Sequence, residues 1–303
     1  MHKKILPFLL IFFISITSYS QYRIDYGVSL GASNYLGEFG GGEGEGRDFV
    51  LDMELSFMRW TAGGFFRYRL APKAAVKGSL NYIRLTGDDK KSDNPARKAR
   101  NLNFKNDMFE FIVTGEFYVY QIRDLGKTGR YENDFNLYLF AGVGAFYSNP
   151  MGQSTSGEWV ALKPLATEGA SYSNINLTVP VGLGFYYTLQ KKYRVGLEIG
   201  WRTTFTDYID DASGTYAYDY DGISNKTDAR LLNQINSEFY QGENGLLPTN
   251  YDAGSKRGNP NNKDSYMTAT VNLSWAIRGK SRFYKSNHGW VLGRRRSKSK
   301  PKF

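Results

Sequence analysis

The segment 109–119, FEFIVTGEFYV, alternates apolar and polar side chains with a period of two residues. Such alternation is typical of a β-strand with one apolar and one polar face. The apolar face holds Phe109, Phe111, Val113, Phe117 and Val119, and the polar face holds Glu110, Thr114, Glu116 and Tyr118. The polar face of this single strand therefore carries two carboxylates.

Seven further segments alternate in the same way, so we expect eight strands. These segments are 22–33, 62–70, 76–85, 135–145, 175–187, 195–205 and 266–277. A soluble β-sandwich would also alternate, but here the polar faces carry charges in mid-strand, and the apolar faces have aromatic residues near both ends. The mid-strand charges are Asp25, Arg67, Lys77, Glu116, Glu198 and Arg202. Apolar-out and polar-in strands of roughly ten residues indicate an outer-membrane barrel, whose closure leaves no unpaired edge in lipid.

The connections between these strands alternate in length. The short or medium connections are 71–74, 123–133 and 190–193, and the long ones are 38–60, 86–106, 147–174 and 207–264. Barrels of this class have short periplasmic turns and long extracellular loops. The predicted fold is therefore all-β, an eight-stranded antiparallel transmembrane barrel with both termini in the periplasm.

The first twenty residues have the order of a secretory signal peptide. Lys3 and Lys4 precede an apolar run of 12 residues, and small residues close the segment before Gln21. A transmembrane anchor would need about 20 apolar residues, which is more than this run provides. We therefore expect three parts: a signal peptide at 1–20, a barrel at 21–283 and a basic periplasmic tail at 284–303.

The composition excludes several kinds of chemistry. The 303 residues hold no cysteine, which excludes disulfide scaffolds, thiolate metal sites and cysteine nucleophiles. A mean hydropathy of -0.48 excludes a polytopic helical membrane protein. The two histidines, His2 and His288, lie near the chain ends. An enzyme acting on lipid acyl chains needs a nucleophile with a base, usually histidine, so we predict no catalytic residue and no cofactor.

An eight-stranded barrel has an interior just wide enough to be filled by side chains. Charged residues on the inward faces must then be paired and hydrogen-bonded, because an isolated buried charge is costly. The predicted interior charge network consists of Arg67, Lys77, Glu110, Glu116, Glu198 and Arg202, accompanied by tyrosines. We expect a salt-bridged plug rather than a diffusion pore.

The net charge of +10 is unevenly distributed along the chain. Residues 278–303 hold ten basic side chains and no acidic one, so the rest of the chain sums to zero. The long connection 207–264 holds ten acidic and five basic side chains. The two ends of the predicted barrel therefore differ in electrostatic character.

Two interpretations of the tail at 284–303 stay open. It is either a solvated, disordered segment or a segment that docks onto a periplasmic partner. In the second case Trp290 anchors the contact, and the basic run Arg294, Arg295 and Arg296 steers the tail toward an acidic surface. A nucleic-acid partner is not expected, because an exported barrel meets none in the periplasm.

The segment 205–216, FTDYIDDASGTY, is the most distinctive loop signature, with Asp207, Tyr208, Asp210 and Asp211 at its centre. Three carboxylates could gather a hard cation through oxygen ligands. The spacing of an EF-hand loop is absent, however, so we predict no metal site. We expect these residues to fold the loop through Asx turns and salt bridges to Arg97 and Arg100.

Three stretches together resemble the PorG-like outer-membrane barrels of Bacteroidetes, which belong to the type IX secretion and gliding machinery. They are GVSLGASNYLGEFG at 27–40, SDNPARKARNLNFKNDMFEF at 92–111 and WRTTFTDYIDDASGTY at 201–216. The resemblance covers roughly 21–283, and its most specific part is FTDYIDD. It implies an outer-membrane protein whose periplasmic side associates with a ring of PorK-like lipoprotein and PorN-like protein, and it brings no catalytic residues.

The leading hypothesis is thus a non-enzymatic barrel, surrounded by outer-membrane lipid, that anchors or positions a periplasmic ring. The alternative is a surface barrel whose acidic extracellular loop, 207–264, binds a ligand or secreted cargo. An acyl-chain enzyme is the third and least supported class, since no histidine lies between residues 3 and 287.

Overall fold

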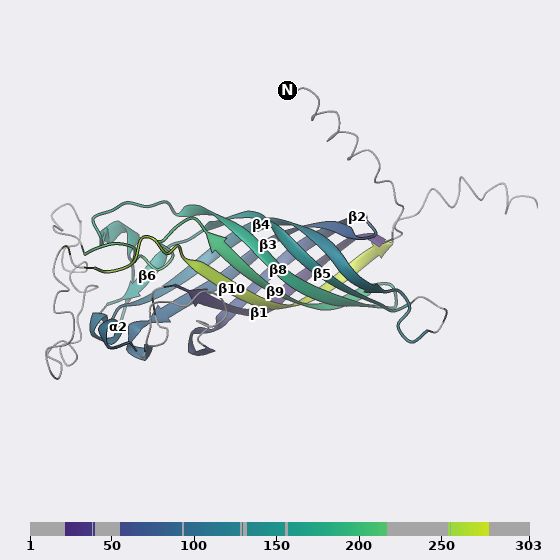
Figure 1. The fold of residues 1–303 in the computed structure, drawn as a ribbon, viewed down its shortest axis with the longest axis horizontal. Helices are drawn as coiled ribbons and strands as arrows, with labels where there is room; N and C mark the ends of the chain where they lie inside the picture. Colours follow the sequence, from purple (N-terminus) through teal and green to yellow (C-terminus); the bar gives the residue numbers. More distant parts are fainter. Residues whose placement is uncertain are drawn as a thin grey trace, which may run out of the picture.

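Eight long antiparallel strands form the body of the computed structural model (Figure 1), which describes residues 22–37, 39, 55–92, 94–127, 129, 132–154, 157–216, 254 and 256–278. The strands are β1 (Tyr22–Leu36), β2 (Arg59–Ala71), β3 (Ala74–Asp88), β4 (Asn103–Ile122), β5 (Asp134–Tyr147), β8 (Ile175–Leu189), β9 (Tyr193–Thr204) and β10 (Ser265–Arg278). All eight predicted strands are confirmed. Most extend past the predicted bounds, because pairing continues where the alternation of apolar and polar residues has stopped.

Neighbouring strands pair in the order β3-β2-β1-β10-β9-β8-β5-β4, and β3 also pairs with β4. That last pairing runs from Ala74 opposite Phe117 to Asp88 opposite Asn103, so the sheet closes on itself. The first strand and the last lie side by side, with Tyr22 opposite Arg278. Closure gives the backbone groups of every long strand a partner on both sides, as a lipid environment requires.

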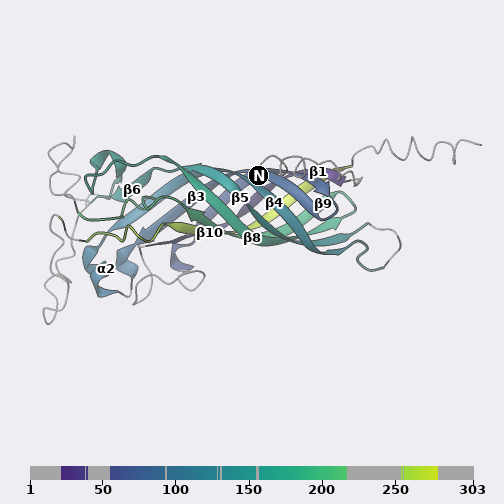
Figure 2. The ribbon, with the colours of Figure 1, turned by 45° about the horizontal axis from the view of Figure 1, so that its top comes forward.

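The two ends of the barrel differ (Figures 1 and 2). We call the end with the short and medium connections the inner end, and the end with the long connections the outer end. At the inner end, β2 and β3 are joined through residues 72–73, β8 and β9 through 190–192, and β4 and β5 through 123–133. At the outer end lie the long connections and their short elements. These elements are η2 (Leu55–Phe57), η3 (Asp89–Lys91), α2 (Pro95–Arg100), the hairpin of β6 (Pro150–Gln153) and β7 (Trp159–Ala161), and η4 (Lys163–Leu165). Among the described residues, no helix is long and apolar enough to cross a membrane.

The outward faces of the strands form an apolar belt. On β4, Phe109, Phe111, Val113, Phe117 and Val119 are all exposed, whereas Glu110, Thr114, Glu116 and Tyr118 between them are buried. Similar exposed residues on the other strands include Val28, Leu30, Leu80, Val143, Leu177, Leu183 and Leu273. A contiguous apolar surface that encircles a protein is rare in water. It is the surface that a transmembrane barrel presents to lipid.

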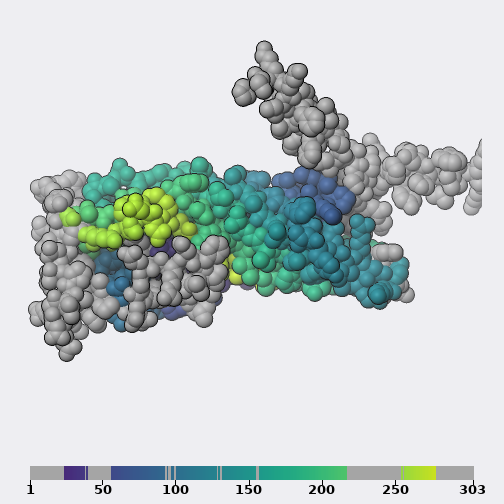
Figure 3. Space-filling view, viewed as in Figure 1, coloured from purple at the N-terminus to yellow at the C-terminus, as the bar shows by residue number. Residues whose placement is uncertain are grey.

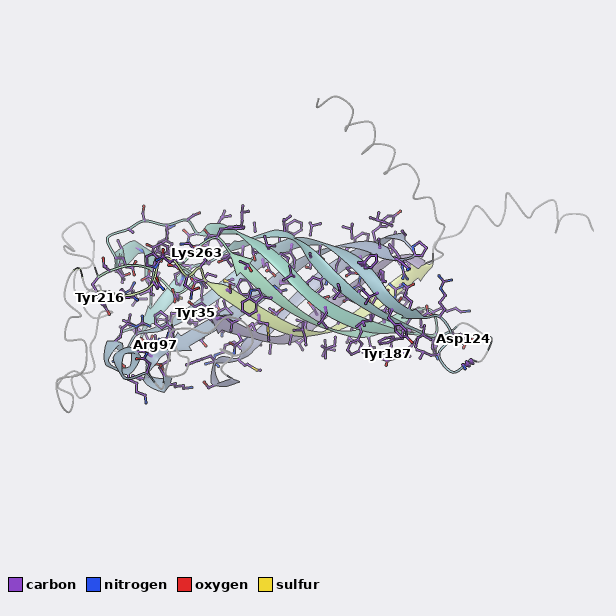
Figure 4. All side chains as sticks on the ribbon, viewed as in Figure 1. Tyr35, Arg97, Asp124, Tyr187, Tyr216 and Lys263 are labelled. Carbon is purple, nitrogen blue, oxygen red and sulfur yellow. The ribbon has the colours of Figure 1, made fainter. Side chains whose placement is uncertain are left out.

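The inside of the barrel is layered. Near the outer end, an apolar cluster includes Ile83, Phe104, Phe146, Tyr266 and, from the loop after β9, Ile209. Near the inner end, aromatic rings form a second cluster, composed of Ala75, Tyr118, Tyr138, Phe140 and Tyr186. Buried charged side chains lie among the rings of the inner cluster, where the Arg67 guanidinium is 5.3 Å from the ring centre of Tyr138 and 5.0 Å from that of Tyr186. In the stick view, Tyr35 and Tyr216 lie toward the outer end, and Asp124 and Tyr187 lie toward the inner end (Figure 4).

The lipid-facing belt makes a depth-dependent prediction. Val143 is 67% exposed and lies opposite Val113, midway along β4. Val143→Arg should therefore destabilise the barrel by about 2–4 kcal/mol, whereas Leu189→Arg, at the inner end of β8, should cost about 0–1 kcal/mol. Reversible unfolding by denaturant in lipid vesicles measures both. Equal costs at the two positions would contradict the assignment of the belt.

Candidate functional site: the charged lumen and its outer cap

Arg67 lies at the centre of the first group of charges in the lumen. Its Nε is 2.8 and 2.9 Å from the two carboxylate oxygens of Glu116, and its Nη1 is 3.0 Å from Asp25 Oδ2. The other oxygen of Asp25 is 2.6 Å from Arg194 Nη1. The hydroxyl of Tyr138 accepts a further hydrogen bond from Arg67 at 3.3 Å. Two arginines and two carboxylates thus form one hydrogen-bonded chain across strands β1, β2, β4 and β9.

Lys77 and Glu198 form the second group. The Lys77 Nζ lies 2.5 Å from Glu198 Oε2, which also accepts a hydrogen bond of 2.8 Å from the Tyr138 hydroxyl. The ammonium is 5.5 Å from the ring centres of both Phe65 and Phe140, within the range of cation–π attraction. The pair therefore spans the lumen from β3 to β9 with aromatic rings around it.

Glu110 collects the third group nearer the outer end. Its Oε1 accepts a hydrogen bond from the Tyr266 hydroxyl at 2.7 Å, and its Oε2 accepts one from Asn81 Nδ2 at 2.9 Å. Arg202 Nε lies 3.5 Å from Glu110 Oε1, and Arg202 Nη1 donates to the carbonyl of Gly200 at 2.9 Å. All six side chains predicted for the interior network are thus buried, and each has an oppositely charged partner.

Among the described residues, the fully buried charges on the strands balance. The buried charged residues on the strands are Asp25, Glu110, Glu116, Glu198, Arg67, Lys77, Arg194 and Arg202, four of each sign. Pairing is what lets these charges remain buried, since an unpaired ion would carry a desolvation cost of several kcal/mol. A cavity of about 20 Å³ beside Lys77 and Glu198 has room for about one water molecule.

Glycines on the inward faces make room for the large aromatic side chains. Tyr118, Tyr138 and Tyr186 have ring centres 5.7 to 6.0 Å apart and occupy the lumen near the inner end. A Cβ at Gly184 would lie 2.6 Å from the Tyr138 hydroxyl, and one at Gly182 would lie 2.5 Å from the Phe140 ring. Small residues opposite large ones allow the narrow interior to be filled.

The loop after β9 folds back over the outer mouth as a cap, which we define as residues 205–216 together with 256–264. The Tyr35 hydroxyl lies 2.6 Å from Asp210 Oδ2 and 2.5 Å from Asp264 Oδ1. The other oxygen of Asp264 accepts the Ile209 amide at 2.9 Å. The Ala212 amide donates to Asp210 Oδ1 at 2.9 Å, which is an Asx turn of the kind predicted for this loop. In the space-filling view the yellow-green segment from residue 256 lies against the outer end (Figure 3).

A buried ion pair holds the middle of the cap. Arg257 Nη2 lies 3.2 Å from Asp211 Oδ2, and Arg257 Nη1 lies 3.1 Å from Glu168 Oε1. The hydroxyls of Thr167 and Tyr172 donate to the two oxygens of Asp211, the latter at 2.6 Å. Burial raises the pKa of the Asp211 carboxyl, and the charge of Arg257 acts in the opposite direction. Burial also raises the pKa of Tyr172, as does the neighbouring Asp211 charge.

Glu168, in the connection between β5 and β8, ties that connection to the cap. Its two carboxylate oxygens accept the amides of Ser213 and Gly214, each at 2.9 Å. The ring of Tyr208 stacks on Tyr172, with ring centres 4.5 Å apart and an angle of 7° between the planes. Two long connections thereby become one folded unit.

The structure gives Arg100 an ion-pair partner other than the predicted aspartates of the cap. Arg100 Nε lies 2.7 Å from Asp89, and its Nη1 donates to the main-chain carbonyl of Arg257 at 2.6 Å. The Asp207 carboxylate is buried as well. Asp211 pairs with Arg257 instead of the predicted arginines because Arg257, although 46 residues away in the sequence, lies just before β10 and so returns to the same end of the barrel.

Several residues of the two networks were not singled out from the sequence. Arg194 directly precedes the predicted strand 195–205, so extending that strand by one residue places it on the inward face. Tyr35, Glu168 and Arg257 carry no local signal, because their partners are distant in sequence. The predicted tail residues Trp290, Arg294, Arg295 and Arg296, and the signal peptide at 1–20, lie outside the described residues.

Fold and surface define a class: this is an eight-stranded β-barrel of the outer-membrane type, with a lipid-facing belt, a filled lumen and long connections at one end. The chain belongs to the family described as "Domain of unknown function (DUF6089)", whose profile matches residues 3–225. Among curated proteins, none matches.

Solved structures of outer-membrane barrels are similar in fold. OprG from Pseudomonas aeruginosa is 7% identical with a TM-score of 0.38, over 88% of this chain and 100% of that one. Ail of Yersinia pestis, in complex with the heparin analogue sucrose octasulfate, is 9% identical with a TM-score of 0.34, over 84% and 98%. The N-terminal barrel domain of Pseudomonas aeruginosa OprF is 8% identical with a TM-score of 0.33, over 85% and 100%.

The lumen network predicts a large cost for removing its central cation. Arg67→Ala leaves Asp25 and Glu116 buried without their shared partner and should destabilise the barrel by about 3–5 kcal/mol. Arg84→Ala removes an ion pair to Asp107 whose side chains are about one-third exposed and should cost about 0.2–1 kcal/mol. Denaturant unfolding in vesicles compares the two variants, and similar costs would contradict a structural role for the buried network.

The cap predicts a local effect that global unfolding would miss. Arg257→Met leaves Asp211 and Glu168 facing each other without a cation, so the cap should open and become a substrate for proteases added to intact cells. Lys256→Met, at the exposed neighbouring position, is the matched control and should leave the cleavage rate unchanged. Equal protease resistance in both variants would show that the ion pair does not hold the cap.

Proposed function

We propose that this protein is a non-enzymatic outer-membrane component of the type IX secretion and gliding machinery. In this role it anchors or positions a periplasmic ring of PorK-like lipoprotein and PorN-like protein. The proposal takes the partners from the sequence resemblance to PorG-like barrels. The observation that carries it is the lumen: paired side chains fill the barrel, so a function at its ends, by contact with other molecules, fits better than transport through it.

The inner end offers a cationic contact surface. Lys73, Arg123, Lys127 and Lys192 in the three inner connections are all exposed. In the sequence, the tail at 284–303 adds further basic residues and no acidic one. Complementary charge increases the rate of association and selects partners by the sign of their surface charge. An acidic face on a periplasmic ring protein would suit this end of the barrel.

The outer end is less suited to the alternative function, in which the acidic connection 207–264 binds a ligand or cargo. Four of its acidic residues, Asp207, Asp210, Asp211 and Asp264, are buried within the cap. The hydrogen bonds of Asp210, Asp211 and Asp264 are made to the protein itself. The charge left for an external ligand is therefore smaller than the sequence count suggests.

Deletion of 284–303 from the tagged, full-length protein tests the role of the tail. Pull-down from native membranes should recover the two ring proteins with the intact chain and clearly less of them with the deletion. The triple variant Arg294→Gln, Arg295→Gln and Arg296→Gln should reduce recovery more strongly at low salt than at high salt, because salt screens the attraction that these charges supply and the variant leaves the Trp290 contact in place. Unchanged recovery in both variants would remove the tail from the proposal.

A chromosomal deletion separates the function classes. Loss of type IX cargo secretion and of gliding is expected, and restoration by the wild-type gene is the control. Normal secretion with loss of binding to an extracellular ligand would favour the surface-barrel alternative. A changed acyl pattern in the membrane lipid would instead indicate an enzyme.

A further inference from the structure

A second site lies on the outside of the barrel, where β2, β3 and β4 reach the outer end and meet β7. A cavity of about 310 Å³ is walled by the aromatic side chains of Phe57, Trp60 and Trp159 and by the cationic side chains of Arg59, Lys91 and Lys105. Lys105 shares the outward face of β4 with the lipid-exposed Phe109, because residues of odd number point outward on that strand. The cavity therefore faces away from the lumen.

An aromatic cluster indicates the depth of this cavity in the membrane. Trp60 stacks on Tyr82 at 4.7 Å between ring centres, and Tyr82 meets Phe109 edge-on at 5.4 Å. Such clusters mark the boundary between the hydrocarbon and the headgroups in transmembrane barrels. Lys105 comes four residues beyond Phe109, or about 13 Å farther along the strand. The cavity thus begins at the boundary and extends into the headgroup layer of the outer leaflet.

Arg59, Lys91 and Lys105 differ from the neighbouring Arg84 in their partners among the described residues. Arg84, at the edge, is held by a two-pronged ion pair to Asp107, with distances of 2.6 and 2.9 Å. By contrast, no carboxylate among the described residues forms an ion pair with Arg59, Lys91 or Lys105. The one acidic residue in the lining, Asp88, accepts the main-chain amide of Lys90 at 3.0 Å.

Aromatic rings and main-chain carbonyls hold these cations in place. Lys105 Nζ lies 4.5 Å from the centre of the Trp159 ring, and Lys91 Nζ lies 5.4 Å from that of Phe57. Arg59 Nη1 donates to the carbonyl of Met58 at 2.9 Å. These contacts orient the cationic groups without cancelling their charge, so an anion with several oxygens can still be bound.

From this arrangement we propose that the cavity binds the phosphorylated headgroup of an outer-leaflet glycolipid. The phosphate oxygens accept charge-assisted hydrogen bonds from Arg59, Lys91 and Lys105, while the acyl chains lie along the belt beside Leu80 and Phe111, which are 60% and 53% exposed. A lipid fits better than a free phosphate because the aromatic wall of the cavity is continuous with the lipid-facing belt. The barrel would thereby carry a specific lipid on the outer side of the membrane, independently of any periplasmic partner.

Full-length protein in phosphatidylcholine nanodiscs, with and without bisphosphorylated lipid A, tests the proposal. Native mass spectrometry should show lipid A retained on the wild-type barrel in preference to phosphatidylcholine. Lys105→Gln should weaken retention roughly tenfold, and the triple variant with Arg59→Gln and Lys91→Gln should abolish the preference. The matched control is Lys263→Gln, which removes an exposed lysine at the outer end that does not line the cavity and should leave retention unchanged.

Two further arms separate the sources of the anion. Lipid A without its phosphates should be retained no better than phosphatidylcholine, and inorganic phosphate should fail to displace the intact lipid. Displacement by inorganic phosphate alone would overturn the lipid assignment in favour of a free-anion site. Equal retention by the wild type and the triple variant, with both still folded by heat-modifiable gel mobility, would overturn the site itself.

Discussion

Lipid cannot hydrogen-bond to a peptide group, and the architecture of this protein follows from that constraint. The pairing of β3 with β4 and of β1 with β10 closes the sheet, so the long strands have no free edge at the depth of the membrane. Closure in turn forces each strand to present one face to lipid and the other to the lumen. The alternation of apolar and polar residues along each strand corresponds to these two faces.

Eight strands leave a lumen too narrow for a water-filled channel, and its charges must therefore neutralise one another. Arg67 does so with Asp25 and Glu116, and Lys77 with Glu198, across strands that are far apart in the sequence. A network of this kind links several strands at once. Removal of one partner leaves the other charges unpaired in a low-dielectric interior. The network therefore acts as a single structural unit.

The two ends of the barrel are built for different surroundings. At the outer end, the ion pair of Arg257 with Asp211 and Glu168 joins two long connections into a folded cap. These acidic side chains are thereby paired within the protein. At the inner end, short connections leave Lys73, Lys127 and Lys192 exposed. On the outside of the barrel, a cavity lined by Arg59, Lys91 and Lys105 lies where β2, β3 and β4 reach the outer end. The filled barrel thus has three surfaces that differ in shape and charge.

The strand number, the face that each side chain takes, the closed barrel and the identity of most lumen charges could be predicted from the sequence, because a period of two residues directly encodes which side of a sheet a residue occupies. Which of these charges meet could be read from the fold alone. Arg194, Tyr35 and Arg257 find partners across the barrel or from another connection, and the cavity around Lys105 is assembled from four separate segments. Local patterning sets the direction in which a side chain points. Contacts between distant segments depend instead on strand register and on closure of the sheet, which no short segment of the sequence specifies.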